Sequence, residues 1–215
     1  MYEQEVREIF GSHQQRNRMM LPYRIAIETV KTKLESLDDE MKCTMAHSPI
    51  HNIKSRVKTP ESIVEKLYRK NYDISYEGVQ RLTDISGVRV ICRYVDDIFY
   101  VAQLLLLQDD ISLVRKTNYI QYPKPNGYRS LHLIVSVPVY LKDGMVQVPV
   151  EIQIRTIAMD MWASLEHNLH YKCDYEENDD INQRLKNCAE TIAKTDIEMQ
   201  NIYRELNSKW SKEES

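Results

Sequence analysis

Two short segments bring together the residue types that handle phosphates and metal ions. The first, QYPKPNGYRSLH at 121–132, is a polar turn that leads into a strand. The second, VEIQIRT at 150–156, alternates strictly, so Ile152 and Ile154 face one side of a predicted strand. The other side carries a carboxylate, an amide and a guanidinium, in the order Glu151, Gln153 and Arg155. This mixture is unusual on a strand beside a core, but it suits a site for phosphates and a metal.

Asp84 and Glu151 are the candidate metal ligands. Asp84 precedes a predicted strand at 88–94, and Glu151 lies on the polar face of another strand. Two carboxylates that meet at a sheet can hold Mg²⁺, which prefers oxygen ligands and keeps waters for substrate phosphates. Spacing alone leaves a structural alternative open, in which Asp84 caps a turn and Glu151 pairs with Arg155.

A basic cluster surrounds the predicted start of a helix at Pro60, with Thr59 as its N-cap. The cluster consists of Arg56, Lys58, Lys66 and Arg69. Helix N-termini offer free amides and partial positive charge, so a triphosphate could bind here. Helical spacing places Ser62 on the same side as Lys66 and Arg69. The alternative is a basic face that contacts only solvent.

Three more side chains have two readings each. Arg89 shares a strand face with Ile91 and Arg93, which suggests stacking, phosphate contact or simple exposure. Tyr128 follows a glycine in a polar loop and is either an aromatic platform for a base or an anchor for the loop. His132 either donates to a phosphate or sugar or has a structural role. The pairs His47/His51 and His167/His170 lack a third metal ligand at a fitting spacing.

Composition narrows the class of protein. The chain has 215 residues, 42% of them hydrophobic and 28% charged, which is typical of a globular domain. Its net charge of −3 argues against bulk electrostatic binding of nucleic acid. No apolar run approaches the about 20 residues that span a bilayer, and the charged N-terminus is unlike a secretory signal. The four cysteines lack CxxC spacing, so we expect reduced thiols in a cytoplasmic protein.

Periodicity predicts an α+β fold, with a mixed sheet between flanking helices in a single domain. Pro22 is expected near the first turn of the second helix, the LLLL run 104–107 is expected to be buried, and Lys142-Asp143-Gly144 predicts a hairpin turn. The acidic segment 174–180 is expected to be a solvated loop. The predicted helices are 3–20, 22–45, 60–70, 76–82, 95–108, 157–171 and 181–206, and the predicted strands are 88–94, 111–116 and the two arms of the hairpin.

The last predicted helix has a heptad pattern of apolar residues. Its positions are Ile181, Leu185, Cys188, Ile192, Thr195, Met199, Ile202 and Leu206. Such a face docks either on its own domain or on another subunit.

Four segments together resemble the synthetase domain of the RelA/SpoT family, in collinear order over about 47–172. They are SRVKTPESIVEKLYRK, DISGVRVICRYVDDI, YPKPNGYRSLH and VEIQIRTIAMDMWASLEH. The resemblance implies a nucleotidyltransferase-like fold that transfers the β,γ-pyrophosphate of ATP to the 3′-hydroxyl of GDP or GTP. The products would be the alarmones ppGpp or pppGpp, with AMP. The short chain is similar to the small, single-domain members, which are usually homotetramers; residues 1–46 would then be N-terminal helices and 173–215 an oligomerisation helix.

The resemblance also implies roles for single residues. Asp84 would be a ligand of Mg²⁺, and Glu151 would activate the 3′-hydroxyl or share the metal. Arg56 and Arg89 would sandwich the adenine of ATP. The ATP phosphates would be held by Lys58, Ser62, Lys66 and Arg69. Tyr128 would stack on guanine, and the acceptor's phosphates and ribose would be surrounded by Lys124, Asn126, His132 and Gln153.

Departures from the family pattern refine the expectation. The chain has no His-Asp dyad of the family's hydrolase domain, so we expect synthesis without hydrolysis. Asn52 and Lys54 stand where product-activated members carry an aromatic and a small hydroxyl residue, which argues against activation by (p)ppGpp; regulation by (p)ppGpp or RNA stays open. Two other functions remain: a toxic relative that acts on adenine nucleotides or tRNA 3′ ends, and a catalytically silent nucleotide- or RNA-binding scaffold.

Overall fold

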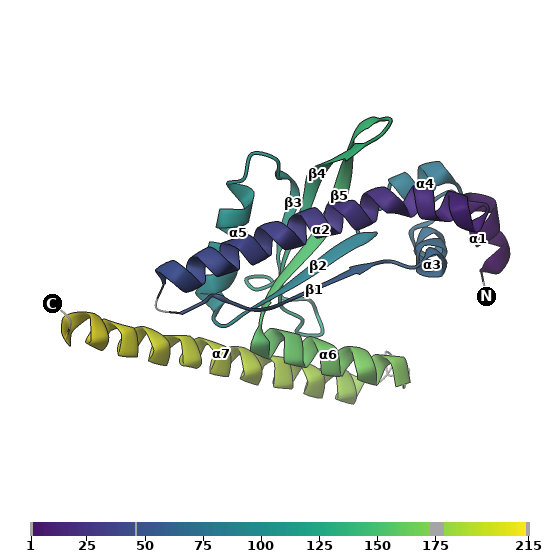
Figure 1. Ribbon diagram of the computed structural model, residues 1–215. Helices are drawn as coiled ribbons and strands as arrows, with labels where there is room; N and C mark the ends of the chain where they lie inside the picture. Colours follow the sequence, from purple (N-terminus) through teal and green to yellow (C-terminus); the bar gives the residue numbers. More distant parts are fainter. Residues whose placement is uncertain (1, 46, 173–178, 214–215) are drawn as a thin grey trace.

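The computed structural model describes residues 2–45, 47–172 and 179–213, and contains a five-stranded mixed sheet (Figure 1). The spatial order is β1-β2-β5-β4-β3; β2 and β5 are parallel, and the other neighbours are antiparallel. The strands are β1 (Ile50–Val57), β2 (Ser86–Cys92), β3 (Ser112–Asn118), β4 (Leu131–Leu141) and β5 (Gly144–Thr156). The expected α+β fold with a mixed sheet is confirmed.

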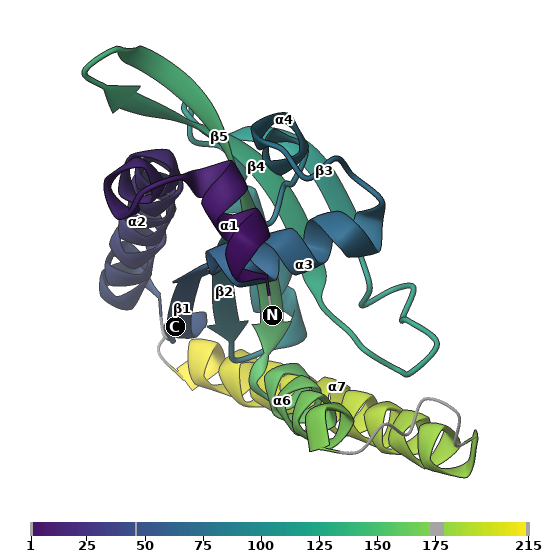
Figure 2. The ribbon, with the colours of Figure 1, turned by 90° about the vertical axis from the view of Figure 1, so that its right-hand side faces the viewer.

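Helices cover one face of this sheet and one of its ends. α2 runs diagonally across the face, and α6 and α7 lie side by side at the end where β5 passes into α6 (Figures 1 and 2). The helices are α1 (Glu3–Phe10), α2 (His13–Thr44), α3 (Pro60–Lys70), α4 (Tyr76–Gln80), α5 (Val95–Leu106), α6 (Ile157–Lys172) and α7 (Asp179–Glu213). The opposite face of β1, β2 and β5 is open to solvent, and its residues line a cavity.

The main core lies between α2, α5 and the covered face of the sheet. Alternate residues of β2 and β5, such as Val88, Val90, Ile152 and Ile154, pack there with Val30 of α2. Since strand side chains alternate between faces, the residues between them must point to the open face. The alternation read from VRVICRY and VEIQIRT therefore sets which side chains reach the cavity.

A second core attaches α3 to α1. Ile63, Val64 and Leu67 of α3 are fully buried beside Val6 and Phe10 of α1. The predicted N-cap is present, because the Thr59 hydroxyl accepts a hydrogen bond from the Ser62 amide at 3.3 Å. These contacts fix the helix that carries the basic side chains.

The boundary predicted between the first two helices is wrong. The chain breaks at Gly11 and Ser12, and Pro22 lies well inside α2. Ser12 and Gln15 form a reciprocal capping box, which supplies hydrogen bonds to the first amides of α2 and so decides where it begins.

Two further expectations need correction. The sequence predicts no strand between the helices 22–45 and 60–70, but the structure contains the edge strand β1 there, whose residues are mostly exposed and do not alternate in hydrophobicity. In the LLLL run Leu105 is fully buried, whereas Leu107 is 68% exposed because it follows the end of α5. The predicted hairpin and the helices that begin at Pro60 and Ile157 are confirmed.

The C-terminal helix is continuous, as the heptad pattern predicts, but its heptad face docks only in part, through Leu185 and Ile192. Ala189, Asp196 and Gln200 are buried against the domain, whereas Met199 and Ile202 are about half exposed. Several hydrogen bonds hold this polar face: the Gln200 side chain accepts from the Asp96 amide at 2.8 Å, and the Tyr203 hydroxyl lies 2.5 Å from His47 Nδ1. The acidic segment at 174–180 falls largely outside the described residues.

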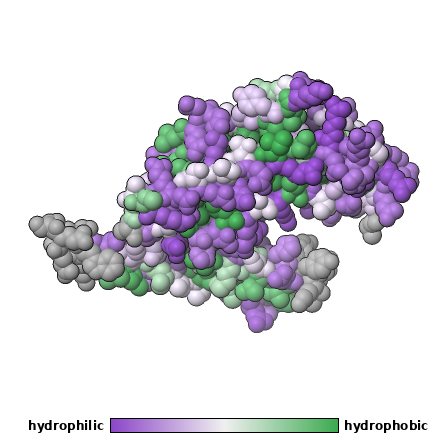
Figure 3. All heavy atoms as spheres, viewed as in Figure 1, coloured by the Kyte–Doolittle hydropathy of each residue, from purple (hydrophilic) through white to green (hydrophobic). Residues whose placement is uncertain are grey.

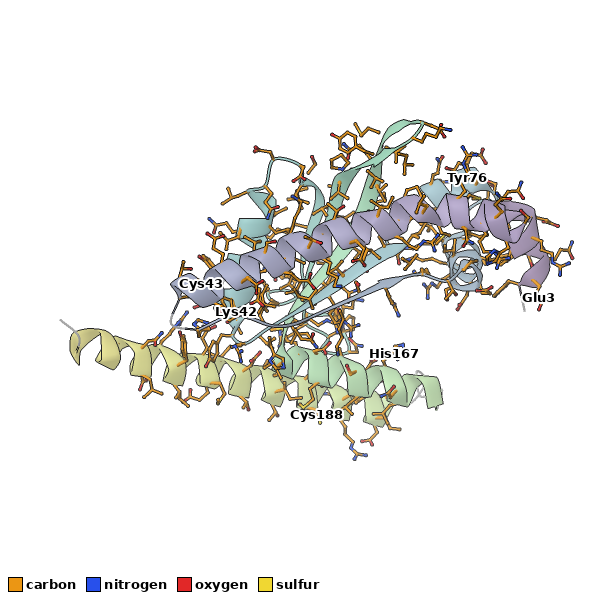
Figure 4. The ribbon with its side chains drawn as sticks, in the orientation of Figure 1. Glu3, Lys42, Cys43, Tyr76, His167 and Cys188 are labelled. Atoms are coloured by element: carbon orange, nitrogen blue, oxygen red, sulfur yellow. The ribbon has the colours of Figure 1, made fainter. Side chains whose placement is uncertain are left out.

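The cysteines with described side chains are free thiols. Cys43 and Cys188 are exposed and lie far apart, on α2 and α7 (Figure 4), and Cys92 is buried in the core. Cys173 lies outside the described residues. Within the part of the chain that the structure describes, no helix combines the length and apolar character needed to cross a membrane.

Candidate active site

Strand register gathers the predicted residues on the open face of the sheet. Arg56 on β1 is opposite Gly87 on β2, which is opposite Glu151 on β5. A neighbouring row joins Arg89 to Gln153 and then to His132 on β4. Three separate segments of the sequence thus contribute to one surface.

A cavity of about 220 Å³ opens on this surface. Its lining includes six of the predicted residues, namely Arg56, Lys58, Asp84, Arg89, Glu151 and Gln153. The surface is visibly hollowed between the α1–α3 end of the molecule and α6 (Figure 3). The structure therefore brings both predicted acids into one hollow together with four other predicted polar side chains.

Asp84 holds two lysines at the edge of the cavity. Its Oδ2 accepts a hydrogen bond from Lys58 Nζ at 2.6 Å and a very short one from Lys66 Nζ. Burial by itself would raise the pKa of Asp84, but the hydrogen bonds and positive charges of the two lysines outweigh it and hold that pKa below its usual value. Burial is also the main cause that lowers the pKa of Lys58. The carboxylate stays ionised, and the lysines are placed for an anion.

Glu151, on β5, has different neighbours. Gln153 Nε2 donates to its Oε2 at 2.9 Å, and His132 Nδ1 lies 3.7 Å from its Oε1. Burial would raise the pKa of Glu151, and the nearby Asp84 carboxylate acts in the same direction, but the contacts with His132 and Gln153 lower it overall. Glu151 is thus an ionised carboxylate in a partly buried site, as a general base must be.

The two carboxylates fit a magnesium ion that is bound together with phosphates. Mg²⁺ is commonly held by one or two carboxylates while substrate phosphates and waters complete its coordination. Within the described residues no three His, Cys, Asp or Glu side chains cluster as a protein-only metal site. His47 instead lies beside Asp97, with its Nε2 3.2 Å from Oδ1. The donor set therefore suits a metal that arrives with a nucleotide.

Of the residues predicted to hold the ATP phosphates, Lys58 lines the cavity, whereas Ser62, Lys66 and Arg69 do not. Ser62 is near the N-terminus of α3, where its hydroxyl accepts from Thr59 Oγ1 at 3.2 Å. Arg69 is exposed in the last turn of α3. The structure does place Lys66 beside the cavity, through its contact with Asp84.

The remaining predicted residues lie on and beside the connection between β3 and β4. Lys124 Nζ lies 4.9 Å from the centre of the Tyr128 ring, and the Tyr128 hydroxyl is 2.8 Å from His132 Nε2. Asn126 accepts from the Tyr128 amide at 3.2 Å and donates to Glu166 at 3.2 Å. The ring of Tyr128, the ammonium group of Lys124 and the imidazole of His132 thus lie on the Glu151 side of the site. Lys58 and Lys66 lie on the other side, beside Asp84.

Gly127 fixes this connection against α7. Its φ is +91°, and a Cβ there would lie 2.6 Å from the Cβ of Ala189. A larger residue would therefore be strained and would push the loop away from the helix. The glycine before Tyr128 has a positional role that the sequence signal NGY only suggested.

Sequence reasoning missed several residues of the site. Lys54 and Gly87 line the cavity, and Asp160 of α6 accepts hydrogen bonds from both Arg89 and Arg155. Arg155 was considered only as a partner of Glu151, whereas it is buried and pairs with Asp160 instead. The glycine inside a strand was a usable signal for a close ligand approach; the pairing of Asp160 required the tertiary structure.

Comparisons with known proteins agree with this geometry. Residues 55–176 match a family model described as "Region found in RelA / SpoT proteins". The chain is 43% identical to the GTP pyrophosphokinase YwaC of Bacillus subtilis over 188 residues, 87% of this chain and 90% of that relative.

Two solved structures from Bacillus subtilis are also similar. The small alarmone synthetase 1 bound to its product pppGpp superposes with a TM-score of 0.83 at 38% identity, covering 89% of this chain and 98% of that one. The same synthetase bound to AMPCPP gives a TM-score of 0.75 at 35% identity, covering 90% and 98%.

Proposed function

Since this chain belongs to the RelA/SpoT family, we propose that it is a GTP pyrophosphokinase that makes the alarmones ppGpp and pppGpp. It transfers the β,γ-pyrophosphate of ATP to the 3′-hydroxyl of GDP or GTP and releases AMP. The observation that carries the proposal is one cavity that contains both Asp84 and Glu151, between basic side chains and an aromatic loop. The synthetase with 38% identity was solved with pppGpp, which is a product of this reaction.

Donor ATP would occupy the side formed by β1, β2 and α3. The guanidinium groups of Arg56 and Arg89 face the cavity from adjacent strands and can enclose an adenine. Lys58 and Lys66 would exchange part of their contact with Asp84 for the triphosphate. Ser62 and Arg69 would be more distant contacts of the ATP phosphates. They would reach the triphosphate only if it extends along α3.

Acceptor GDP or GTP would occupy the side of the β3–β4 connection. Tyr128 offers a ring for stacking on guanine, and Lys124, Asn126, His132 and Gln153 surround the space beside it. Stacking of a base on an aromatic side chain contributes about 1–3 kcal/mol. The ribose then lies near Glu151, which separates the two nucleotide sites.

The chemical step follows from these positions. Glu151 accepts the proton of the 3′-hydroxyl, whose oxygen attacks the β-phosphorus of ATP; the bond between the α,β-bridging oxygen and the β-phosphorus breaks and AMP departs. Lys58 and Lys66 stabilise negative charge on the transferred group. Mg²⁺, held by Asp84 and by Glu151, would neutralise further phosphate charge when it is bound.

The decisive experiment is chromatographic analysis of nucleotide products. Purified protein with ATP, Mg²⁺ and GMP, GDP or GTP should release AMP and form a guanosine 3′-diphosphate product. Asp84→Ala and Glu151→Ala should each lower the rate at least about 1,000-fold, because general-base and charge stabilisation are each worth several powers of ten. Full activity in either variant would refute the assignment.

Parallel reactions address the other functions. AMP or tRNA as acceptor should yield no product, and transfer to either would favour the toxic relatives. Binding of both nucleotides without release of AMP would indicate a silent scaffold. Incubation with ppGpp should release no pyrophosphate, since synthesis without hydrolysis is proposed.

The proposal also covers organisation and context. We take residues 47–172 as the catalytic core, 1–46 as N-terminal helices and 173–215 as an oligomerisation segment in a cytoplasmic homotetramer. Exposed apolar residues on α6 and α7 support the assembly, for example Leu165, Ile202 and Leu206. Lys54 lines the cavity, and the neighbouring Asn52 is exposed; neither provides an aromatic platform, which supports a synthetase that its product does not activate.

A further inference from the structure

Asp160 is the common partner of two arginines that belong to different nucleotide sites. Its Oδ1 accepts a hydrogen bond from Arg89 Nη1 and another from Arg155 Nη1, both at 3.2 Å. Asp160 and Arg155 are only 8% and 4% exposed, whereas the Arg89 side chain reaches the cavity. The single negative charge of the buried carboxylate is shared by two guanidinium groups, so loss of the carboxylate leaves Arg155 buried without an anionic partner.

The other end of Arg155 contacts the acceptor side. Its Nη2 donates to the Tyr128 hydroxyl at 2.6 Å and to Gln153 Oε1 at 2.8 Å, and its guanidinium carbon lies 5.0 Å from the centre of the Tyr128 ring. Gln153 in turn donates to Glu151. A continuous series of hydrogen bonds therefore links Arg89 through Asp160 and Arg155 to Tyr128. A branch through Gln153 reaches the carboxylate of Glu151.

The backbone makes this connection stiff. β5 passes into α6 without a loop, so Arg155 at the end of the strand and Asp160 in the first turn of the helix have little freedom relative to each other. The same helix packs beside β2, which carries Arg89. The carboxylate is thus fixed by the scaffold, and only the ends of the chain of contacts lie where nucleotides bind.

On the basis of the function proposed above, we propose that Asp160 is a positioning residue that couples binding of the ATP donor to binding of the guanine acceptor. Adenine that stacks on Arg89 orders its guanidinium on Asp160, and Asp160 holds Arg155 against Tyr128. The second nucleotide then binds to a site whose side chains are already ordered, which gives positive cooperativity. Because coupling is reciprocal, GDP strengthens donor binding by the same factor.

Binding measurements test the coupling directly. Calorimetry of GDP in the absence and presence of saturating AMPCPP avoids turnover, because a methylene group replaces the α,β-bridging oxygen at which the bond breaks. The wild-type protein should bind GDP at least about 5-fold more tightly with AMPCPP present. In Asp160→Ala the factor should fall to about one, while each nucleotide alone still binds.

Controls separate coupling from damage to the fold. Asp143→Ala, at the tip of the β4–β5 hairpin, removes an exposed carboxylate that pairs with Arg18 and should keep the wild-type factor. If Asp160→Ala does not fold, Asp160→Asn retains the shape without the charge and should also reduce the factor.

Three results have distinct meanings. An unchanged factor in the Asp160 variant, or no coupling in the wild-type protein, overturns the inference while the proposed function stands. Absence of GDP and AMPCPP binding in the wild-type protein, together with no synthesis of alarmone, would instead refute the proposed function itself.

Discussion

At the scale of single residues, the cavity depends on a strand position that has no side chain. Gly87 lies between Arg56 and Glu151 in the strand register and forms part of the cavity lining. A Cβ added there would meet only the Arg56 carbonyl oxygen, at 3.7 Å. Packing does not exclude a side chain at this position, so a ligand that needs the space explains the glycine better than folding does.

Gly87→Val should therefore affect activity much more than stability. The branched side chain suits a strand but would project into the space between the two nucleotides, so kcat/KM should fall on the order of 100-fold. The free energy of unfolding, measured by thermal denaturation, should change by no more than about 1 kcal/mol. Ser112→Val, at an exposed position of β3, is the matched control; equal activity of the two variants would contradict this use of the cavity.

Lys58 gives the site a pH dependence. Burial, the largest cause, together with the charges of Lys66 and Arg56, lowers the pKa of Lys58 despite the opposing contact with Asp84. The free enzyme therefore loses this positive charge at a lower pH than an ordinary lysine, whose pKa is about 10.4. Since we propose that this charge binds the ATP phosphates, kcat/KM for ATP should begin to fall at a lower pH than the pKa of an ordinary lysine.

Lys58→Arg identifies the group. A guanidinium stays protonated up to about pH 12, so the alkaline limb of the profile should move to higher pH in this variant. Lys31→Arg, on the outer side of α2 between Glu28 and Glu35, should leave the profile unchanged. Superimposable profiles of wild-type and Lys58→Arg proteins would assign the limb to another residue.

At the scale of elements, hydrogen bonds and a pair of stacked rings hold the C-terminal half of α7 to the domain. The ring of Tyr203 stacks on Tyr94 with centroids 4.4 Å apart, and its hydroxyl lies 2.5 Å from His47 Nδ1. The hydroxyl also accepts from Asn207 Nδ2 at 2.6 Å. The loop before β1 and the helix near the C-terminus are thereby joined.

Tyr203→Phe should loosen this part of α7 without changing the catalytic cavity. Loss of the hydroxyl removes two hydrogen bonds and should lower the free energy of unfolding by about 1–2 kcal/mol. Amide hydrogen exchange should accelerate along 196–207. Tyr140→Phe changes an exposed tyrosine in the hairpin and is the control; the same protection in both variants would show that the hydroxyl does not hold the helix.

How far the sequence predicts these elements depends on how local their signals are. The helix at Pro60 and the face assignments of β2 and β5 follow from capping and alternation over a few residues, and they are correct. β1 has no such signal, because a solvent-exposed edge strand pairs through its backbone and tolerates almost any side chain. The predicted start of the second helix is wrong because it rests on Pro22, whereas the capping box at Ser12 sets the start of α2.

The same distinction applies to the site. Alternation correctly places Arg89, Glu151 and Gln153 on one face, and the register then brings them together. The pairing of Asp160 with arginines on two different strands depends on how α6 leaves β5 and packs on β2, which no local pattern encodes.

At the scale of the whole molecule, a broad apolar stripe is left in solvent. It follows α6 and α7, and hydrophobic residues are visible along this lower edge of Figure 3. Its members include Met161, Leu165, Leu169, Ile197, Met199, Ile202 and Leu206, each at least 44% exposed. An apolar surface of this kind favours association, so we expect the stripe to form a contact in the proposed homotetramer.

Met199→Asp together with Ile202→Asp should break that contact. Charges buried at an apolar interface are costly, so light scattering after size exclusion should show a smaller species than the wild-type protein. Asn187→Asp adds the same kind of charge at an exposed polar position of α7 and should leave the mass unchanged. A double variant with the wild-type mass would place the interface elsewhere.

One arrangement in the fold bears on how such a protein can change over time. In the proposed arrangement the donor side is built from β1, β2 and α3, whereas Lys124, Asn126 and Tyr128 all lie in the single connection between β3 and β4. Replacing that connection would change which base the acceptor side binds, while the residues proposed to bind ATP would stay the same. Natural selection or loop grafting could therefore direct the same reaction to a different acceptor by changing one short stretch of backbone.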